Sequence, residues 1–155
     1  MTFNEYLVSW AQLHGTQPPS GLVRAWLRIS FTLSTPLVRF NPNVITSFGL
    51  VLMGSAIYFA LPSHENFFLA SILVLSVGLV DSFDGIVAVR TSKTSSWGAF
   101  LDGIVDRLVD VGIAILLIVL GAPTEIAVLA MSVALIHEYM RAKASGIGFR
   151  EVGVI

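Results

Sequence analysis

The sequence predicts an all-α integral membrane protein, with an N-terminal interfacial amphipathic helix and at least four transmembrane helices. Three observations lead to this fold class: the composition, four long apolar runs, and the placement of Lys and Arg between those runs. Of the 155 residues, 55% are apolar and only 12% are charged, whereas soluble domains carry about 25% charged residues. A soluble globule with so few charges would have too little polar surface to cover itself.

Residues 1–40 divide into two segments ahead of the first apolar run. We expect residues 1–20 to form a polar segment that breaks at its two adjacent prolines. Residues 21–40 mix apolar side chains with arginines and contain Pro36, a pattern typical of an amphipathic helix in the membrane interface. In the turn that follows, Asn43 is expected to cap the next helix, because its side-chain oxygen can accept an orphan backbone N–H.

The transmembrane domain is predicted over residues 41–155. A transmembrane helix needs roughly 20 mostly apolar residues. The apolar runs cover residues 44–61, 67–86, 98–122 and 125–140. The second run reaches that length only if its helix continues beyond Val80.

The cationic residues predict the orientation in the membrane. Outside the runs, Lys and Arg precede the first run, lie between the second and third, and follow the fourth: Arg24, Arg28, Arg39, Arg90, Lys93, Arg141, Lys143 and Arg150. The other two links, residues 62–66 and 123–124, contain neither Lys nor Arg. By the positive-inside rule, the N-terminus, the 90–97 loop and the C-terminus face the cytoplasm of a multi-pass cell (plasma) membrane protein.

The aspartates are the unusual feature of this apolar chain. All five lie between residues 81 and 110, in and beside the stretch DSFDGIVAVRTSKTSSWGAFLDGIVD. Asp81 and Asp84 are three residues apart and Asp102 and Asp106 are four apart, so each pair shares one helix face. Because a short loop joins the two helices, we expect them to be antiparallel neighbours. Both pairs then meet just below the cytoplasmic surface.

Four facing carboxylates predict a cation between them. Ionisable groups inside a membrane protein are costly and usually functional, and oxygen-only ligands suit Mg²⁺, Ca²⁺ or Mn²⁺. Carboxylate-bound divalent ions are a common means of handling phosphates. A divalent-cation transporter or binding protein is the alternative, although transport sites usually lie near the membrane midplane and these carboxylates lie at one face. The net charge of -1 does not favour a nucleic-acid partner.

The complete pattern resembles a family signature. Seven residues match the motif D-x2-D-G-x2-A-R-x8-G-x3-D-x3-D of the CDP-alcohol phosphotransferase family: Asp81, Asp84, Gly85, Ala88, Gly98, Asp102 and Asp106. At typical residue frequencies, such a match arises by chance on the order of once in 10⁸ starts. Among family members, the chain looks most like the phosphatidylinositol-phosphate synthases, to which the segment EYMRAKASGIG at 138–148 is also similar.

The resemblance implies a metal-dependent transferase whose donor is a CDP-alcohol, often CDP-diacylglycerol, and whose products include CMP. It implies Mg²⁺ or Mn²⁺ as cofactor, held by Asp81, Asp84, Asp102 and Asp106, with Asp106 also taking the acceptor's proton. The first two of these aspartates would thereby hold the nucleotide's diphosphate. The remaining nucleotide-binding residues implied by the resemblance are Gly85, Ala88, Arg90, Gly98, Pro42, Asn43 and Thr46.

The same resemblance suggests an acceptor site after the fourth run. Arg141 and Lys143 fall where these synthases place cations for an acceptor phosphate. The acceptor would then be a polyol, more specifically a phosphorylated polyol, and the partners would include membrane lipids and a second copy of the chain in a homodimer.

Two departures from the family pattern keep a catalytically inactive member as an alternative. Val89 stands where the family has Arg, and Arg90 comes one residue later, a shift that rotates a helical side chain by about 100°. Family members usually have six spans where four are found here, so we expect either a domain that continues beyond Ile155 or a minimal form of it.

Overall fold

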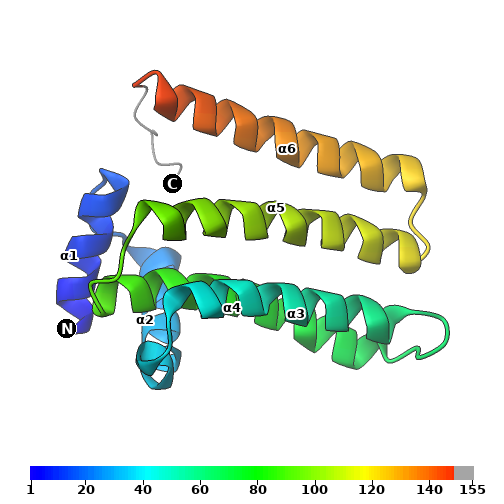
Figure 1. The fold of residues 1–155 in the computed structure, drawn as a ribbon, viewed down its shortest axis with the longest axis horizontal. Coiled ribbons are helices and arrows are strands. Elements are labelled where there is room, and N and C mark those ends of the chain that lie inside the picture. The colour runs from blue at the N-terminus through cyan, green and yellow to red at the C-terminus, as the bar shows by residue number, and fades with distance from the viewer. Residues whose placement is uncertain (149–155) are drawn as a thin grey trace.

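A computed structural model describes residues 1–148, and helices are the only regular secondary structure over that range (Figure 1). The helices are α1 (Phe3–His14), α2 (Gly21–Leu33), the 3-10 helix η1 (Thr35–Arg39), α3 (Pro42–Ala60), α4 (Phe67–Arg90), α5 (Ser96–Val119) and α6 (Thr124–Gly146). The all-α prediction is confirmed for these residues. Residues 149–155, the end of the predicted domain, lie outside the described residues.

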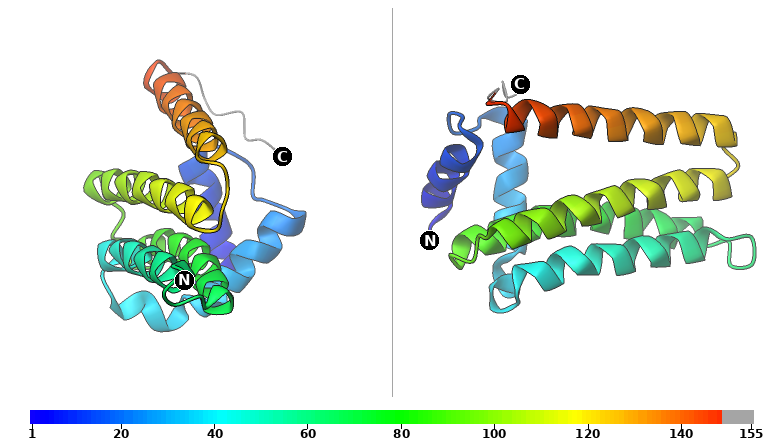
Figure 2. Two further views of the ribbon diagram at one scale, coloured as in Figure 1. Left: turned by 90° about the vertical axis from the view of Figure 1, so that its right-hand side faces the viewer. Right: turned by 45° about the horizontal axis from the view of Figure 1, so that its top comes forward.

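The four long helices run up and down along one direction, and α1 and α2 lie across one end of them (Figures 1 and 2). α3 packs against both α4 and α5, and α5 packs against α6. α4 and α5 run antiparallel, as predicted, but their backbones barely contact each other. The space between them therefore has to be filled by side chains or by a ligand.

The starts of α3 and α5 follow from capping side chains. Asn41, rather than Asn43, caps α3: its side-chain Oδ1 accepts a hydrogen bond of 3.0 Å from the Asn43 backbone N–H. The prediction for Asn43 is wrong because Pro42 already occupies the first helical turn, where its fixed φ suits a helix and its missing N–H has no cost. Ser95 caps α5 by accepting from the Gly98 N–H at 3.0 Å.

The polar segment predicted for residues 1–20 contains the helix α1. Thr2 and Glu5 form a reciprocal capping box at its start, and Gly15 ends it with φ of 63°. This left-handed conformation is one that glycine adopts at little cost. Tyr6, Leu7 and Ala11 are buried on one face of α1, which packs on α4.

The predicted amphipathic helix over 21–40 is broken. α2 ends at Leu33, and η1 follows with Pro36 in its first turn, because a proline cannot continue the hydrogen bonding of an α-helix interior. The Trp26 indole N–H donates to Ser82 Oγ at 3.1 Å, which fastens α2 to α4.

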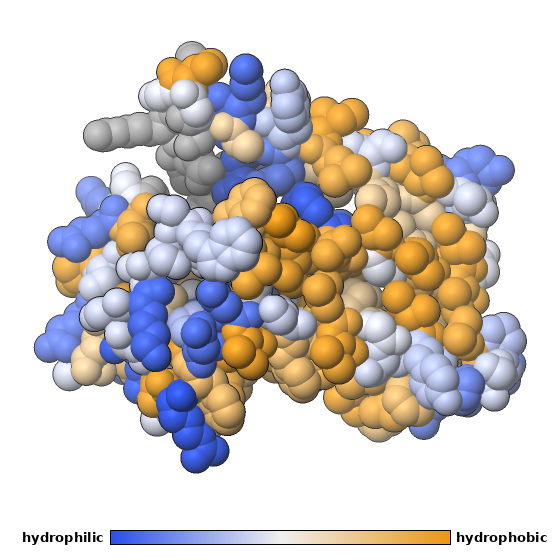
Figure 3. Space-filling model, viewed as in Figure 1, coloured by the Kyte–Doolittle hydropathy of each residue, from blue (hydrophilic) through white to orange (hydrophobic). Residues whose placement is uncertain are grey.

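The long helices expose apolar side chains in a broad band between two hydrophilic ends (Figure 3). α3 and α4 are long and apolar enough to cross a membrane, and only 33% of the most apolar window of each is buried within the molecule. α5 and α6 have similar lengths, 24 and 23 residues, but contain more charged side chains. For these two helices, and for an interfacial position of α2, membrane contact stays a prediction.

Candidate active site

A cavity of about 850 Å³ opens at the end of the bundle where α1 and α2 lie. Side chains from α1, α2, α3, α4, α5 and the α4–α5 loop line it. Its volume lies within the range of small-molecule sites, roughly 300–1,000 Å³. The separation of α4 from α5 thus leaves a space large enough for a nucleotide.

Three of the predicted aspartates converge in this cavity. Carboxylate oxygens of Asp81 on α4 and of Asp102 and Asp106 on α5 all lie within 4.8 Å of one another. The i, i+4 spacing places the two α5 aspartates on one helix face, and the antiparallel course of α4 brings Asp81 to the same level. A hard divalent cation with oxygen ligands fits this donor set, because it neutralises carboxylates that otherwise repel one another.

Asp84 also lines the cavity but is held by the protein. It is only 6% exposed. Its Oδ2 lies 2.5 Å from the Thr46 hydroxyl, and its Oδ1 accepts from the Gly85 N–H at 2.5 Å. Thr46 Oγ1 also lies 3.1 Å from the Pro42 carbonyl oxygen. The α3 segment predicted for nucleotide binding therefore fixes the carboxylate of Asp84.

The small residues of the motif border the cavity, and two of its glycines differ in how much space surrounds them. Gly85, Ala88 and Gly98 all line the cavity, as do Pro42 and Asn43. A Cβ on Gly98 would lie 3.1 Å from Ser95 Oγ and 3.3 Å from Asn43 Oδ1, so this glycine permits close packing of α5 on the start of α3. A Cβ on Gly85 would meet no atom within 4 Å and would occupy open space.

Arg90 does not reach the cavity. Its guanidinium donates to the Phe31 carbonyl oxygen at 3.0 Å and to Thr35 Oγ1 at 3.2 Å, and it lies 4.2 Å from the centre of the Phe31 ring. Val89 lines the cavity in its place. Because the arginine stands one residue later than in the family motif, its side chain contacts α2 and η1 instead of the cavity. Among the described residues, Lys93 is the one Lys or Arg side chain that lines the cavity.

The two predicted acceptor residues also lie outside the cavity lining. Arg141 donates to both carboxylate oxygens of Glu138, at 2.9 and 2.6 Å, and Lys143 is exposed near the end of α6. Arg107 of α5 connects the Arg141–Glu138 ion pair to the aspartates, since it lies 3.3 Å from Asp110 and 4.0 Å from both Asp106 and Glu138. An ionic network therefore links α5 to α6 beside the cavity.

The sequence interpretation missed the cavity wall formed by Tyr6, Trp10 and Leu13 of α1. Two sequence signals were present. Thr2 and Glu5 have the spacing of a capping box, and apolar residues at 3, 6, 7, 10 and 11 have helical periodicity. For Lys93 the sequence indicates only membrane orientation, because nothing in its spacing distinguishes a ligand-binding lysine from a flanking charge.

Comparison with known proteins gives a family match and several relatives. Residues 39–149 match the sequence profile of the CDP-alcohol phosphatidyltransferase family. An uncharacterized protein of Aquifex aeolicus is 38% identical over 136 residues, which cover 78% of this chain and 67% of the relative. No solved structure matches the chain significantly.

Two further relatives have names that state an activity. The CDP-diacylglycerol–glycerol-3-phosphate 3-phosphatidyltransferase of Wigglesworthia glossinidia brevipalpis is 34% identical over 84 residues, covering 53% of this chain and 46% of the relative. The archaetidylinositol phosphate synthase of Pyrococcus horikoshii is 34% identical over 86 residues, covering 56% of this chain and 44% of the relative. The chain thus spans less than half the length of these two proteins.

Proposed function

The chain belongs to the CDP-alcohol phosphatidyltransferase family, and from this premise we propose that it transfers a phosphatidyl group from CDP-diacylglycerol to an acceptor hydroxyl and releases CMP. The observation that carries the proposal is the convergence of Asp81, Asp102 and Asp106 in a nucleotide-sized cavity. Two relatives are named for phosphatidyl transfer or for the synthesis of an inositol-phosphate lipid. On this proposal the protein acts in phospholipid biosynthesis.

The reaction assigns distinct roles to the residues around the cavity. The acceptor hydroxyl oxygen forms a bond to the phosphorus next to diacylglycerol, and the bond from that phosphorus to the CMP oxygen breaks. Asp106 accepts the hydroxyl proton, and CMP leaves with the electron pair of the broken bond. Asp84, fixed by Thr46 and Gly85, supports the donor side of the site.

Mg²⁺ or Mn²⁺ is the cofactor that the four motif aspartates would hold. When bound, such an ion supplies charge neutralisation to phosphate oxygens during displacement at phosphorus. Lys93 supplies a further positive charge at the cavity wall. It takes the part that the sequence interpretation gave to Arg90, whose guanidinium is bonded to Phe31 and Thr35.

We propose a phosphorylated polyol as the acceptor. One relative's name includes glycerol-3-phosphate and another's includes inositol phosphate. Arg141 and Lys143 stay the proposed acceptor-binding residues, with the requirement that Arg141 exchanges its pairing with Glu138 for the acceptor phosphate. A homodimer, implied by the family resemblance, stays a prediction.

The proposed setting is the cell membrane, with the cavity facing the cytoplasm. The α4–α5 loop, the end of α6 and the N-terminal helices all lie at the cavity end of the bundle (Figure 1). That end carries every described Lys and Arg except Arg107, as the positive-inside rule requires of a cytoplasmic face.

Release of CMP from CDP-diacylglycerol, with a panel of charged and uncharged polyols, tests the function. Asp102→Asn and Asp106→Asn should each abolish CMP release, and removal of divalent ions by a chelator should do so reversibly. Asp110→Asn is the matched control, because this aspartate lies one turn further along α5 and does not line the cavity. Full activity in both cavity variants would refute the assignment, and metal flux into sealed liposomes without nucleotide would favour a transporter.

A further inference from the structure

α1 forms part of the cavity wall although it precedes the residues that match the family profile, 39–149. Tyr6, Trp10 and Leu13 of α1, with Leu27 of α2, border the same space as the motif aspartates. The family match assigns no role to this wall. Its chemistry differs from that of the α4 and α5 walls, because it is built from aromatic and aliphatic side chains.

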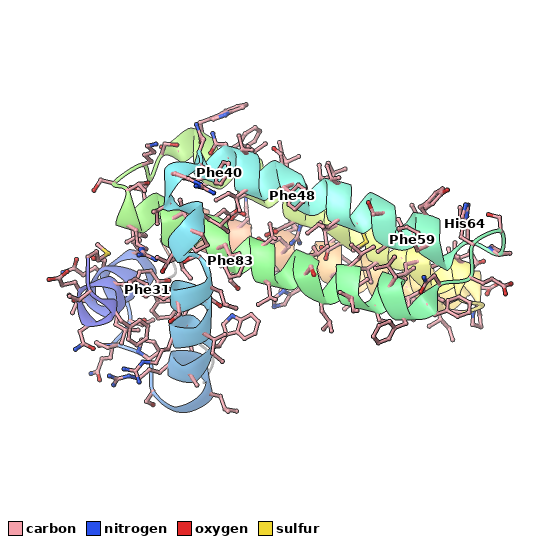
Figure 4. All side chains as sticks on the ribbon, turned by 90° about the horizontal axis from the view of Figure 1, so that it is seen from below. Phe31, Phe40, Phe48, Phe59, His64 and Phe83 are labelled. Carbon is pink, nitrogen blue, oxygen red and sulfur yellow. The ribbon has the colours of Figure 1, made fainter. Side chains whose placement is uncertain are left out.

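Tyr6 is held firmly in this wall. Only 2% of its surface is exposed. Its ring centre lies 5.4 Å from that of Phe31 and 6.4 Å from that of Phe3, and the side chain packs with Leu27 and Ile86. Figure 4 shows Phe31 reaching from α2 toward α1. Because neighbours enclose the ring, the hydroxyl keeps one position relative to the cavity.

The Tyr6 hydroxyl has no hydrogen-bond partner among the described residues. Burial raises the pKa of Tyr6 to about 12, so the phenol stays protonated at neutral pH and can donate or accept a hydrogen bond. Buried polar groups in folded proteins are nearly always hydrogen-bonded. A hydroxyl without a protein partner, on a side chain that borders a cavity, is therefore expected to bond to what occupies that cavity.

The chemistry of the wall indicates which part of a ligand it contacts. The diphosphate carries negative charge, which Lys93 and a divalent ion held by the aspartates would neutralise. A nucleoside has apolar ring faces and neutral polar edges, which match an aromatic wall carrying one neutral hydroxyl. We propose that the Tyr6 hydroxyl hydrogen-bonds to the nucleoside part of the CDP donor, an inference that rests on the proposed transferase function.

Tyr6→Phe tests this inference by removing one oxygen atom. Tyr58→Phe is the matched control: Tyr58 lies near the end of α3, where its ring centre is 3.9 Å from that of His64. CMP is the binding probe, with its Kd measured by titration calorimetry in detergent with Mg²⁺. KM values for CDP-diacylglycerol and for the acceptor, and the thermal unfolding midpoint, are measured on the same preparations.

We expect Tyr6→Phe to raise the Kd of CMP about three- to tenfold, the effect of one neutral hydrogen bond, and to raise the donor KM similarly. The acceptor KM should not change. The unfolding midpoint should stay level, because the change removes a hydroxyl that forms no hydrogen bond within the described residues. Tyr58→Phe should leave the Kd of CMP unchanged.

Three results would overturn the inference. An unchanged Kd of CMP in Tyr6→Phe, with normal CMP binding by the wild-type protein, would remove the nucleoside contact and leave the transferase function intact. A rise in the acceptor KM alone would assign the hydroxyl to the acceptor. If the wild-type protein neither binds nor releases CMP, the proposed function itself fails and the inference fails with it.

Discussion

Asp84 is the most buried of the four motif aspartates, and it is the one whose carboxylate is bonded to protein groups rather than gathered with the others. The Thr46 hydroxyl approaches it from α3 and the Gly85 N–H from α4. Thr46, which the family resemblance suggests for nucleotide binding, lines the cavity and also holds this aspartate in place.

Replacing Thr46 by Val should disturb that aspartate without changing the volume of the side chain. A hydrogen bond to a charged group contributes about 1.5–3 kcal/mol, so we expect kcat/KM for the CDP donor to fall by at least tenfold, since about 1.4 kcal/mol corresponds to a factor of ten. Thr46→Ser, which keeps the hydroxyl, should recover most of the loss. Equal activity of the Val and Ser variants would show that the hydroxyl has no role.

Gly85→Ala separates cavity volume from stability. An added Cβ would meet no atom within 4 Å, and Ala in place of Gly inside a helix is favourable by about 0.5–1 kcal/mol. The unfolding midpoint should therefore stay level or rise, while the donor KM rises because the methyl group projects into the cavity. Gly103→Ala is the control on α5. An added Cβ there also meets no atom within 4 Å, and Gly103 does not line the cavity.

Lys93→Ala should raise the donor KM about tenfold, because the charge is lost from the cavity wall. Since the side chain is exposed, the difference from the wild-type protein should shrink at higher ionic strength. Lys93→Arg should restore most of the affinity.

By contrast, Arg141→Ala should raise the acceptor KM by one to two orders of magnitude, equivalent to roughly 1.4–2.7 kcal/mol. If Lys93→Ala and Arg141→Ala each change the donor KM and the acceptor KM equally, the assignment of Lys93 to the donor and Arg141 to the acceptor is wrong.

Among the helices, α3 is the element on which the site depends most. It packs against α4 and α5 and holds them with little backbone contact between the two. On α5, Gly112 faces Met53 of α3, whose side chain a Cβ on Gly112 would overlap. Met53 is only 3% exposed, so it has little room to move.

Gly112→Ala should consequently destabilise the protein. Overpacking a well-packed core costs about 1–3 kcal/mol, which exceeds the gain in helix propensity from replacing Gly by Ala. We expect a lower thermal unfolding midpoint in detergent, and reduced activity because α5 carries two of the site's aspartates. Gly54→Ala on α3, where a Cβ meets nothing within 4 Å, should not lower the midpoint. A midpoint for Gly112→Ala equal to that of the wild-type protein would show that the contact adapts.

On the scale of the whole molecule, an apolar band separates two hydrophilic ends (Figure 3), and the cavity lies at the end that carries the cations. A nucleotide donor made in the cytoplasm requires that this end face the cytoplasm. The 62–66 loop between α3 and α4 lies at the opposite end (Figure 1).

Single cysteines test this orientation, because the chain has none of its own. Ser20 precedes α2 and its side chain makes no capping hydrogen bond, and Ser63 is exposed in the far loop. Cysteine at Ser63 should react with a membrane-impermeant thiol reagent in intact cells, and cysteine at Ser20 only after the cells are opened. The reverse pattern would place the cavity on the wrong side for a cytoplasmic nucleotide.

The sequence by itself determined the helical class, the approximate bounds of the four long helices, the family resemblance and the aspartate motif. The family match confirms the resemblance. These features depend on local spacing: apolar run length, i, i+3 and i, i+4 pairs, and capping residues act within one helix or between adjacent ones. The rotation of Arg90 away from the motif face followed from the same spacing.

Only the tertiary structure decided which side chains share the cavity. α3 packs against both α4 and α5, whose backbones barely contact each other, and the cavity opens beside their aspartates. Asp84 bonds to Thr46, which is 38 residues away in the chain, and Arg90 bonds to Phe31, which is 59 residues away. The docking of α1 brings Tyr6 to the cavity. Contacts at such separations depend on how the helices pack together, which no periodicity within a single segment specifies.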